Sequence, residues 1–63
     1  MKTVIITGAT SGIGLETALK LTGKGYFVIG VGHSRENCDR AIEQILKRNP
    51  EAKTVYFSGE LMQ

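Results

Sequence analysis

Three glycines lie close together near the start of the chain, at Gly8, Gly12 and Gly14, directly after an apolar run. Where a strand turns into a helix, the first N–H groups of the helix have no partner within it, and the helix dipole adds partial positive charge. Such a turn can bind a phosphate or pyrophosphate group. We expect Gly8 to turn the chain out of the strand, Gly12 to leave room for phosphate, and Gly14 to let the helix pack closely on the sheet. No Gly-Lys-Ser/Thr sequence follows, which excludes a P-loop.

The elements that position this turn alternate between strands and helices. Apolar runs rich in β-branched and aromatic residues predict strands at 3–7, 26–31 and 53–58. Apolar residues at helical spacing predict helices over about 12–21 and 35–48. Helical connections of this length join parallel strands through right-handed crossovers, so the sequence predicts an α/β fold, half of a doubly wound sheet in the order β-α-β-α-β.

Each predicted helix has a distinct apolar face and recognisable ends. In the first helix Ile13, Thr17, Ala18 and Leu21 are spaced to share the buried face, and nearby glycines are expected to end the helix. The second helix begins after a capping serine, Ser34, and is amphipathic. Because both crossovers run the same way, both helices should cover one face of the sheet, although the strands are apolar on both faces.

Composition limits the class of protein. The 63 residues can form one small domain, and 41% of them are hydrophobic, which is ordinary for a folded chain. The net charge of +2 comes from interleaved charges, which argues against a nucleic-acid-binding stripe. No apolar run suits a signal peptide or a membrane span. Cys38 is the single cysteine and no metal-ligating cluster surrounds it, so we expect a soluble, cytoplasmic chain with Cys38 in its core.

The glycine turn, residues 7–14, has the sequence TGATSGIG. It resembles the cofactor signature Thr-Gly-x-x-x-Gly-Ile-Gly of the short-chain dehydrogenase/reductase family, and the segments GLETA and HSRENCDRA are similar to its retinol-dehydrogenase-like members. The resemblance covers essentially the whole chain, and it implies the N-terminal part of a Rossmann domain that binds a nicotinamide dinucleotide. It implies that the cofactor's diphosphate and ribose lie against Gly8, Thr10, Ser11, Gly12, Ile13 and Gly14.

The end of the second predicted strand bears on which nicotinamide cofactor is bound. Members that prefer NAD commonly carry an acid there, which accepts hydrogen bonds from the ribose hydroxyls. This chain instead has Gly32, followed by His33, Ser34 and Arg35. Arg35 can bind a phosphate through two parallel hydrogen bonds, so the sequence favours NADP(H), with NAD as the alternative. In the competing interpretation, His33 and Arg35 are ordinary surface residues.

The segment SGELMQ, after the third predicted strand, resembles the Gly-Asp-Leu sequence with which the family contacts the adenine. The resemblance implies that Glu60, in place of the aspartate, accepts a hydrogen bond from the adenine amino group and that Leu61 makes an apolar contact. Alternatively, Glu60 is a solvated acid.

The catalytic pair of the family, Tyr-x-x-x-Lys, is absent from this chain. Four residues after Tyr26 stands Gly30, and four residues after Tyr56 stands Glu60. We therefore expect no catalytic residue here, and an N-terminal fragment of an enzyme whose full-length form oxidises alcohols or reduces carbonyls. The alternative is a non-catalytic nucleotide-binding or self-assembling module. In either case the uncovered apolar face of the sheet calls for a partner, either the remainder of a longer chain or a second copy in a homo-oligomer.

Overall fold

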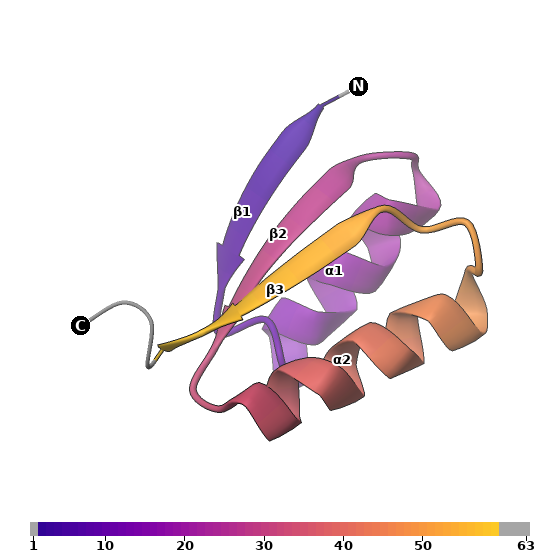
Figure 1. The fold of residues 1–63 in the computed structure, drawn as a ribbon. Coiled ribbons are helices and arrows are strands. Elements are labelled where there is room, and N and C mark those ends of the chain that lie inside the picture. The colour runs from indigo at the N-terminus through magenta and orange to yellow at the C-terminus, as the bar shows by residue number, and fades with distance from the viewer. Residues whose placement is uncertain (1, 60–63) are drawn as a thin grey trace.

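The computed structural model describes residues 2–59, which form three strands and two helices (Figure 1). The three strands are parallel and lie in the order β1-β2-β3. The predicted half of a doubly wound α/β sheet is confirmed, and every element ends within two residues of its predicted position. In chain order the elements are β1 (Thr3–Thr7), α1 (Gly12–Gly23), β2 (Phe27–Gly32), α2 (Arg35–Arg48) and β3 (Thr54–Ser58).

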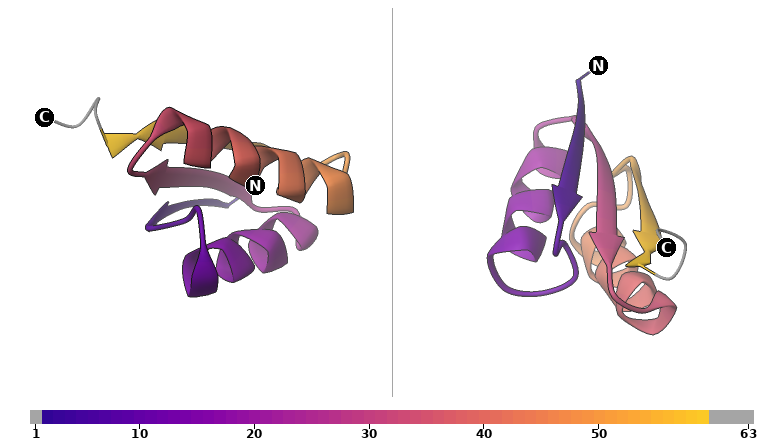
Figure 2. Two further views of the ribbon diagram at one scale, coloured as in Figure 1. Left: turned by 90° about the horizontal axis from the view of Figure 1, so that it is seen from below. Right: turned by 90° about the vertical axis from the view of Figure 1, so that its left-hand side faces the viewer.

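Both helices cover the same face of the sheet, as two right-handed crossovers in one direction require (Figures 1 and 2). Their carboxyl ends are joined by a hydrogen bond of 3.2 Å, which the side-chain amide of Asn49 donates to the carbonyl oxygen of Thr22. The alternating burial of residues along the central strand β2 agrees with this arrangement. Val28, Gly30 and Gly32 are buried beneath the helices, whereas the residues between them are only half buried.

The hydrophobic core lies between the sheet and the two helices. Ala18 of α1, Val28 of β2 and Ile45 of α2 are fully buried and pack together. Cys38 and Ala41 of α2 are also buried, so most of the apolar face predicted for this helix packs on the sheet. Leu46, which has the same helical spacing, is the exception and is 40% exposed. Cys38 is thus a core residue, as expected.

The buried face predicted for α1 is wrong at its first member. Ile13 is 86% exposed, and the buried residues of α1 are Ala18 and Thr22. At the amino end of α1 the close approach is made by Gly14, whose backbone lies against Gly8. Neighbouring residues of a helix point about 100° apart, so Ile13 turns away from the sheet.

The sheet face opposite the helices carries a continuous row of apolar side chains, which we call the open face. Neighbouring strands place Ile5 beside Ile29 and Ile29 beside Val55, and the next row along the strands includes Val31 and Phe57. Ile5, Val55 and Phe57 are 68%, 39% and 46% exposed. The prediction that the strands are apolar on both faces is confirmed, and one of these faces is uncovered among the described residues.

Residues 2–59 contain neither a membrane-spanning helix nor a metal-binding cluster. Neither α1 nor α2 has the length and apolar character needed to cross a bilayer. The described residues also contain no cluster of three or more His, Cys, Asp or Glu side chains able to hold a metal ion.

Candidate functional site

The glycine loop, residues 8–11, connects the carboxyl end of β1 to the amino end of α1. Gly8, the first residue of the loop, and Gly12, which follows the loop and begins α1, have φ angles of +65° and +58°, in the left-handed region that favours glycine. A β-carbon at either position would meet no atom of residues 2–59 within 4 Å. Backbone conformation therefore requires glycine at both positions, and the space beside Gly12 is open.

The first N–H groups of α1 are free to bind a ligand. Within residues 2–59, the N–H groups of Gly12, Ile13 and Gly14 donate no hydrogen bond. Ser11 stands at the N-cap, but its hydroxyl makes no capping hydrogen bond, and the first turn of α1 holds no acidic side chain. Ser11, Gly12 and Ile13 are exposed. The partial positive charge of the helix end, the unpaired donors and the open space together suit an anionic group.

Gly14 brings α1 close to the glycine loop. A β-carbon on Gly14 would overlap the carbonyl oxygen of Gly8 and would lie 3.1 Å from the Cα of Ala9. Both neighbours are backbone atoms, which cannot rotate away as a side chain can. Glycine at position 14 thus sets the distance between the helix and the loop whose N–H groups it presents.

Ala9 anchors the loop to the sheet. It is fully buried, and its N–H donates to the carbonyl oxygen of Val31 at the end of β2, at 3.1 Å. Its own carbonyl oxygen accepts a hydrogen bond of 2.8 Å from the hydroxyl of Tyr56, which belongs to β3. Burial, and to a lesser extent the charge of Cys38 when ionised, raise the pKa of Tyr56 to about 12. The hydroxyl therefore keeps its proton and remains a donor at neutral pH.

Thr10 packs on the carboxyl end of β2. A β-carbon on Gly32 would overlap the Cγ2 methyl group of Thr10 and lie 3.0 Å from the Sγ of Cys38. The small residue at position 32 thus makes room for both side chains. Cys38 in turn donates a weak hydrogen bond to the carbonyl oxygen of Phe57, at 3.6 Å. The methyl of Thr10 faces the protein, and the contact expected between its hydroxyl and a cofactor stays a prediction.

Of the three residues expected near the ribose hydroxyls or 2′-phosphate of the cofactor, His33 and Ser34 lie in the turn between β2 and α2, and Arg35 is the first residue of α2. This turn stands at the same edge of the sheet as the glycine loop, since both follow the carboxyl ends of neighbouring parallel strands. His33 and Arg35 are exposed, and within the described residues Arg35 forms no ion pair. The Oγ of Ser34 accepts a hydrogen bond of 3.1 Å from the N–H of Asn37, so it caps α2 and retains its proton to donate elsewhere.

The chain that leaves β3 passes beside this turn. A β-carbon on Gly59 would lie 3.2 Å from the carbonyl oxygen of Gly32 and 3.7 Å from the Cα of His33. Glu60 and Leu61, the residues expected to contact the adenine, follow directly but lie outside the described residues. The structure thus brings the glycine loop, the turn after β2 and the end of β3 to one edge of the sheet.

Sequence analysis missed the part played by Tyr56 and Gly30. From the sequence, Tyr56 is only a possible catalytic tyrosine, and the absence of lysine four residues later argues against that role. In the structure its ring covers Gly30, where a β-carbon would overlap the ring, and its hydroxyl reaches the loop. A glycine in the middle of an apolar strand was the available signal, because such a glycine often marks the close approach of another group.

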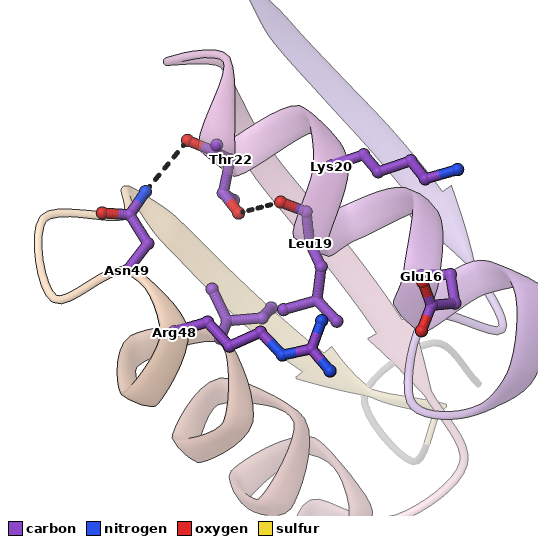
Figure 3. A pocket seen from close by; sticks show the side chains of 8 residues that line it. Glu16, Leu19, Lys20, Thr22, Arg48 and Asn49 are labelled. Carbon is purple, nitrogen blue, oxygen red and sulfur yellow. Dashed lines mark hydrogen bonds between the residues drawn. The ribbon is translucent and has the colours of Figure 1, made fainter.

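A hollow of about 280 Å³ lies away from this edge, between α1 and α2 (Figure 3). Its polar groups largely serve the fold: the hydroxyl of Thr22 donates to the carbonyl oxygens of Ala18 and Leu19, at 2.9 and 3.1 Å, and Asn49 donates to the carbonyl of Thr22. Its charged side chains, Glu16, Lys20 and Arg48, come from two exposed helix surfaces.

Comparison with known proteins agrees with the geometry. The family model for the short chain dehydrogenases matches residues 2–63, so the chain belongs to this family. It is 35% identical over 58 residues to a 7alpha-hydroxysteroid dehydrogenase of Bacteroides fragilis, a match that covers 92% of this chain and 22% of that protein. It is 46% identical over 44 residues to human retinol dehydrogenase 13, covering 70% of this chain and 13% of that protein.

Among solved structures, the chain is similar to YwfH, an NADPH dependent reductase involved in bacilysin biosynthesis. The TM-score is 0.86 at 29% sequence identity, and the match covers 98% of this chain and 24% of that one. The likeness extends over both helices and all three strands. The chain therefore spans about a quarter or less of the length of these relatives.

Proposed function

We propose that this chain is the cofactor-binding N-terminal part of a nicotinamide-dependent oxidoreductase, and that its glycine loop binds the pyrophosphate of NADP(H). The observation that carries the proposal is the set of unpaired N–H groups at Gly12 and Ile13, beside open space at the positive end of α1. Membership of the short chain dehydrogenase family supports it. Ser11 stands at the same helix end and adds a hydroxyl, and Gly8, Thr10 and Gly14 shape the loop.

NADP(H) is preferred to NAD(H) in this proposal because of the residues after β2. No carboxylate stands from Gly32 to Arg35, where one would accept from the ribose hydroxyls and repel a 2′-phosphate. The guanidinium of Arg35 is exposed and permanently charged, and His33 and Ser34 can add hydrogen bonds. The name of the similar structure YwfH, an NADPH dependent reductase, favours the same choice. NAD(H) is the alternative.

The remaining contacts and the reaction are assigned as follows. Glu60 and Leu61 would bind the adenine. The full-length protein would transfer hydride between the cofactor and an alcohol or carbonyl substrate, and its catalytic residues would come from other parts of that protein, because neither Tyr26 nor Tyr56 is followed by the lysine that the family uses. The thiol of Cys38 is buried and forms no disulfide within residues 2–59, which fits a reducing compartment, and we place the protein in the cytoplasm.

The test compares two fragments of the cofactor by amide NMR, 2′,5′-ADP and 5′-AMP. Both should shift the N–H signals of Gly12 and Ile13, since both carry a 5′-phosphate, and 2′,5′-ADP should shift Arg35 more. Equal responses of Arg35 to both compounds would remove the preference for NADP(H). Unchanged signals at Gly12 and Ile13 would remove the binding site itself.

The open face supports a further part of this proposal: that other segments of the same polypeptide cover it. Parallel sheets are normally covered on both faces. Ile5 and Phe57 are large apolar side chains that are exposed on the open face, and contiguous exposed apolar patches usually mark a surface that packs against a partner. Separated from such segments, the chain should self-associate through this face, and Phe57→Lys should reduce the association measured by light scattering. A well-folded monomer of the unsubstituted chain would contradict both this assignment and the alternative of a self-assembling module.

A further inference from the structure

The side chain of Tyr56 reaches from β3, one edge strand of the sheet, to the glycine loop that follows β1, the other edge strand. It belongs to β3 and lies opposite Gly30 in the register of β2 and β3. Its ring packs across Gly30, since a β-carbon there would overlap the ring atoms, and against the core cluster of Ala18, Val28 and Ile45. From this position the hydroxyl donates to the carbonyl oxygen of Ala9 at 2.8 Å. A side chain from the third strand thus reaches a loop that follows the first.

The hydrogen bond from Tyr56 is made to a buried part of the loop that other contacts also hold. Ala9 is fully buried, and its N–H donates a hydrogen bond to the carbonyl oxygen of Val31. The backbone of Gly8, the preceding residue, packs against Gly14. The hydroxyl of Tyr56 supplies the remaining hydrogen bond, on the carbonyl side of Ala9. Beyond Ala9 the chain has only three residues in which to reach Ile13, so the orientation of the peptide at Ala9 bears directly on where the free N–H groups point.

We infer that Tyr56 is a positioning residue for the cofactor: its hydrogen bond to Ala9 holds the glycine loop in the shape that presents the N–H groups of Gly12 and Ile13 to the pyrophosphate. The inference rests on the function proposed above. Binding is strengthened when the loop is fixed beforehand, because the ordering of a mobile loop would otherwise be subtracted from the affinity. Within residues 2–59 the hydroxyl of Tyr56 has one hydrogen-bond partner, the backbone carbonyl of Ala9, so in this inference the hydroxyl acts through the loop and not on the cofactor.

The chain offers a matched control in Thr54. This residue also belongs to β3, is also half buried, and also donates its hydroxyl to a backbone carbonyl, that of Val28 at 2.7 Å. Val28 lies near the start of β2, away from the glycine loop. Tyr56→Phe and Thr54→Val each remove one hydroxyl and keep the size and shape of the side chain. Both should lower stability by similar amounts, but Tyr56→Phe alone should loosen the loop.

The experiment measures two properties of the protein that contains this chain, unsubstituted and with each of the two substitutions, under conditions where all three forms are folded. The first is the dissociation constant of NADP⁺, from amide NMR titration. The second, which needs no ligand, is the rate of hydrogen exchange at the N–H of Ala9. Tyr56→Phe should raise the dissociation constant and the exchange rate about three- to tenfold, the range expected for one neutral hydrogen bond. Thr54→Val should change the dissociation constant less than about twofold.

The outcomes separate this inference from the function on which it rests. If the unsubstituted protein binds NADP⁺ and Tyr56→Phe binds it equally well, the positioning role is wrong and the proposed function stands. If both variants weaken binding equally, or if Tyr56→Phe unfolds where Thr54→Val does not, the hydroxyl supports the fold as a whole and the positioning role is again wrong. If the unsubstituted protein binds no NADP⁺, both proposals fail.

Discussion

Replacing Gly14 by alanine tests the packing that brings α1 to the glycine loop. Alanine in a helix is normally more stable than glycine by about 1 kcal/mol. At position 14, however, the new methyl group would overlap the carbonyl oxygen of Gly8, and neither backbone can rotate away. Forcing extra atoms into a closely packed site costs about 1–3 kcal/mol, and more where the backbone must move. We therefore expect Gly14→Ala to lower the free energy of unfolding by about 1–2 kcal/mol in spite of the gain in helix propensity.

Gly23→Ala in the same helix is the control. Gly23 is the last residue of α1, and a β-carbon there would meet no atom within 4 Å. This substitution should leave stability unchanged or raise it by up to about 1 kcal/mol. In a domain of this size the two variants should then differ by about 10 °C in thermal midpoint, measured by circular dichroism. A Gly14→Ala variant as stable as Gly23→Ala would show that α1 does not lie against Gly8, and the geometry argued for the loop would be refuted.

Three further predictions concern single side chains. Arg35→Ala should weaken binding of 2′,5′-ADP about tenfold, as expected for lost charge-assisted hydrogen bonds, and should leave 5′-AMP nearly unaffected in the same titration. Ser34→Ala removes the cap of α2 and should lower the free energy of urea unfolding by about 1 kcal/mol. The pKa of Tyr56 is raised to about 12 from 10.0, so its contribution to stability is complete below pH 10 and is lost as the pH rises toward 12. The ultraviolet absorbance of tyrosinate should show an ionisation near pH 12 that Tyr56→Phe lacks, and a midpoint near pH 10 would contradict the burial of its hydroxyl.

Much of the fold could be predicted because its signals are local. The strands are short apolar runs, and the helices are recognised by apolar residues that recur at helical spacing. Ser34 caps α2 by accepting a hydrogen bond from a residue only three positions further along the chain. The parallel order then follows from the length of the connections and the handedness of crossovers. Ile13 was misplaced for a related reason, because its spacing fits the apolar face but the close approach of Gly14 decides which way the first turn of α1 points.

The backbone conformation of the candidate site could be predicted from the sequence, but the side-chain contacts that hold the glycine loop could not. The glycine spacing predicts the turn, the left-handed conformations at Gly8 and Gly12 and the free donors that follow. The contact between Tyr56 and Ala9 joins residues 47 positions apart, and it depends on strand register and on the missing side chain at Gly30. Neither can be obtained from spacing along a single sequence.

The most direct test of the central claim is a crystal structure of the protein containing this chain with NADP⁺ bound. The account predicts pyrophosphate oxygens about 2.7–3.2 Å from the backbone nitrogens of Gly12 and Ile13, the ordinary length of such hydrogen bonds. A pyrophosphate bound elsewhere, with these two N–H groups paired to the protein's own carbonyls, would contradict it.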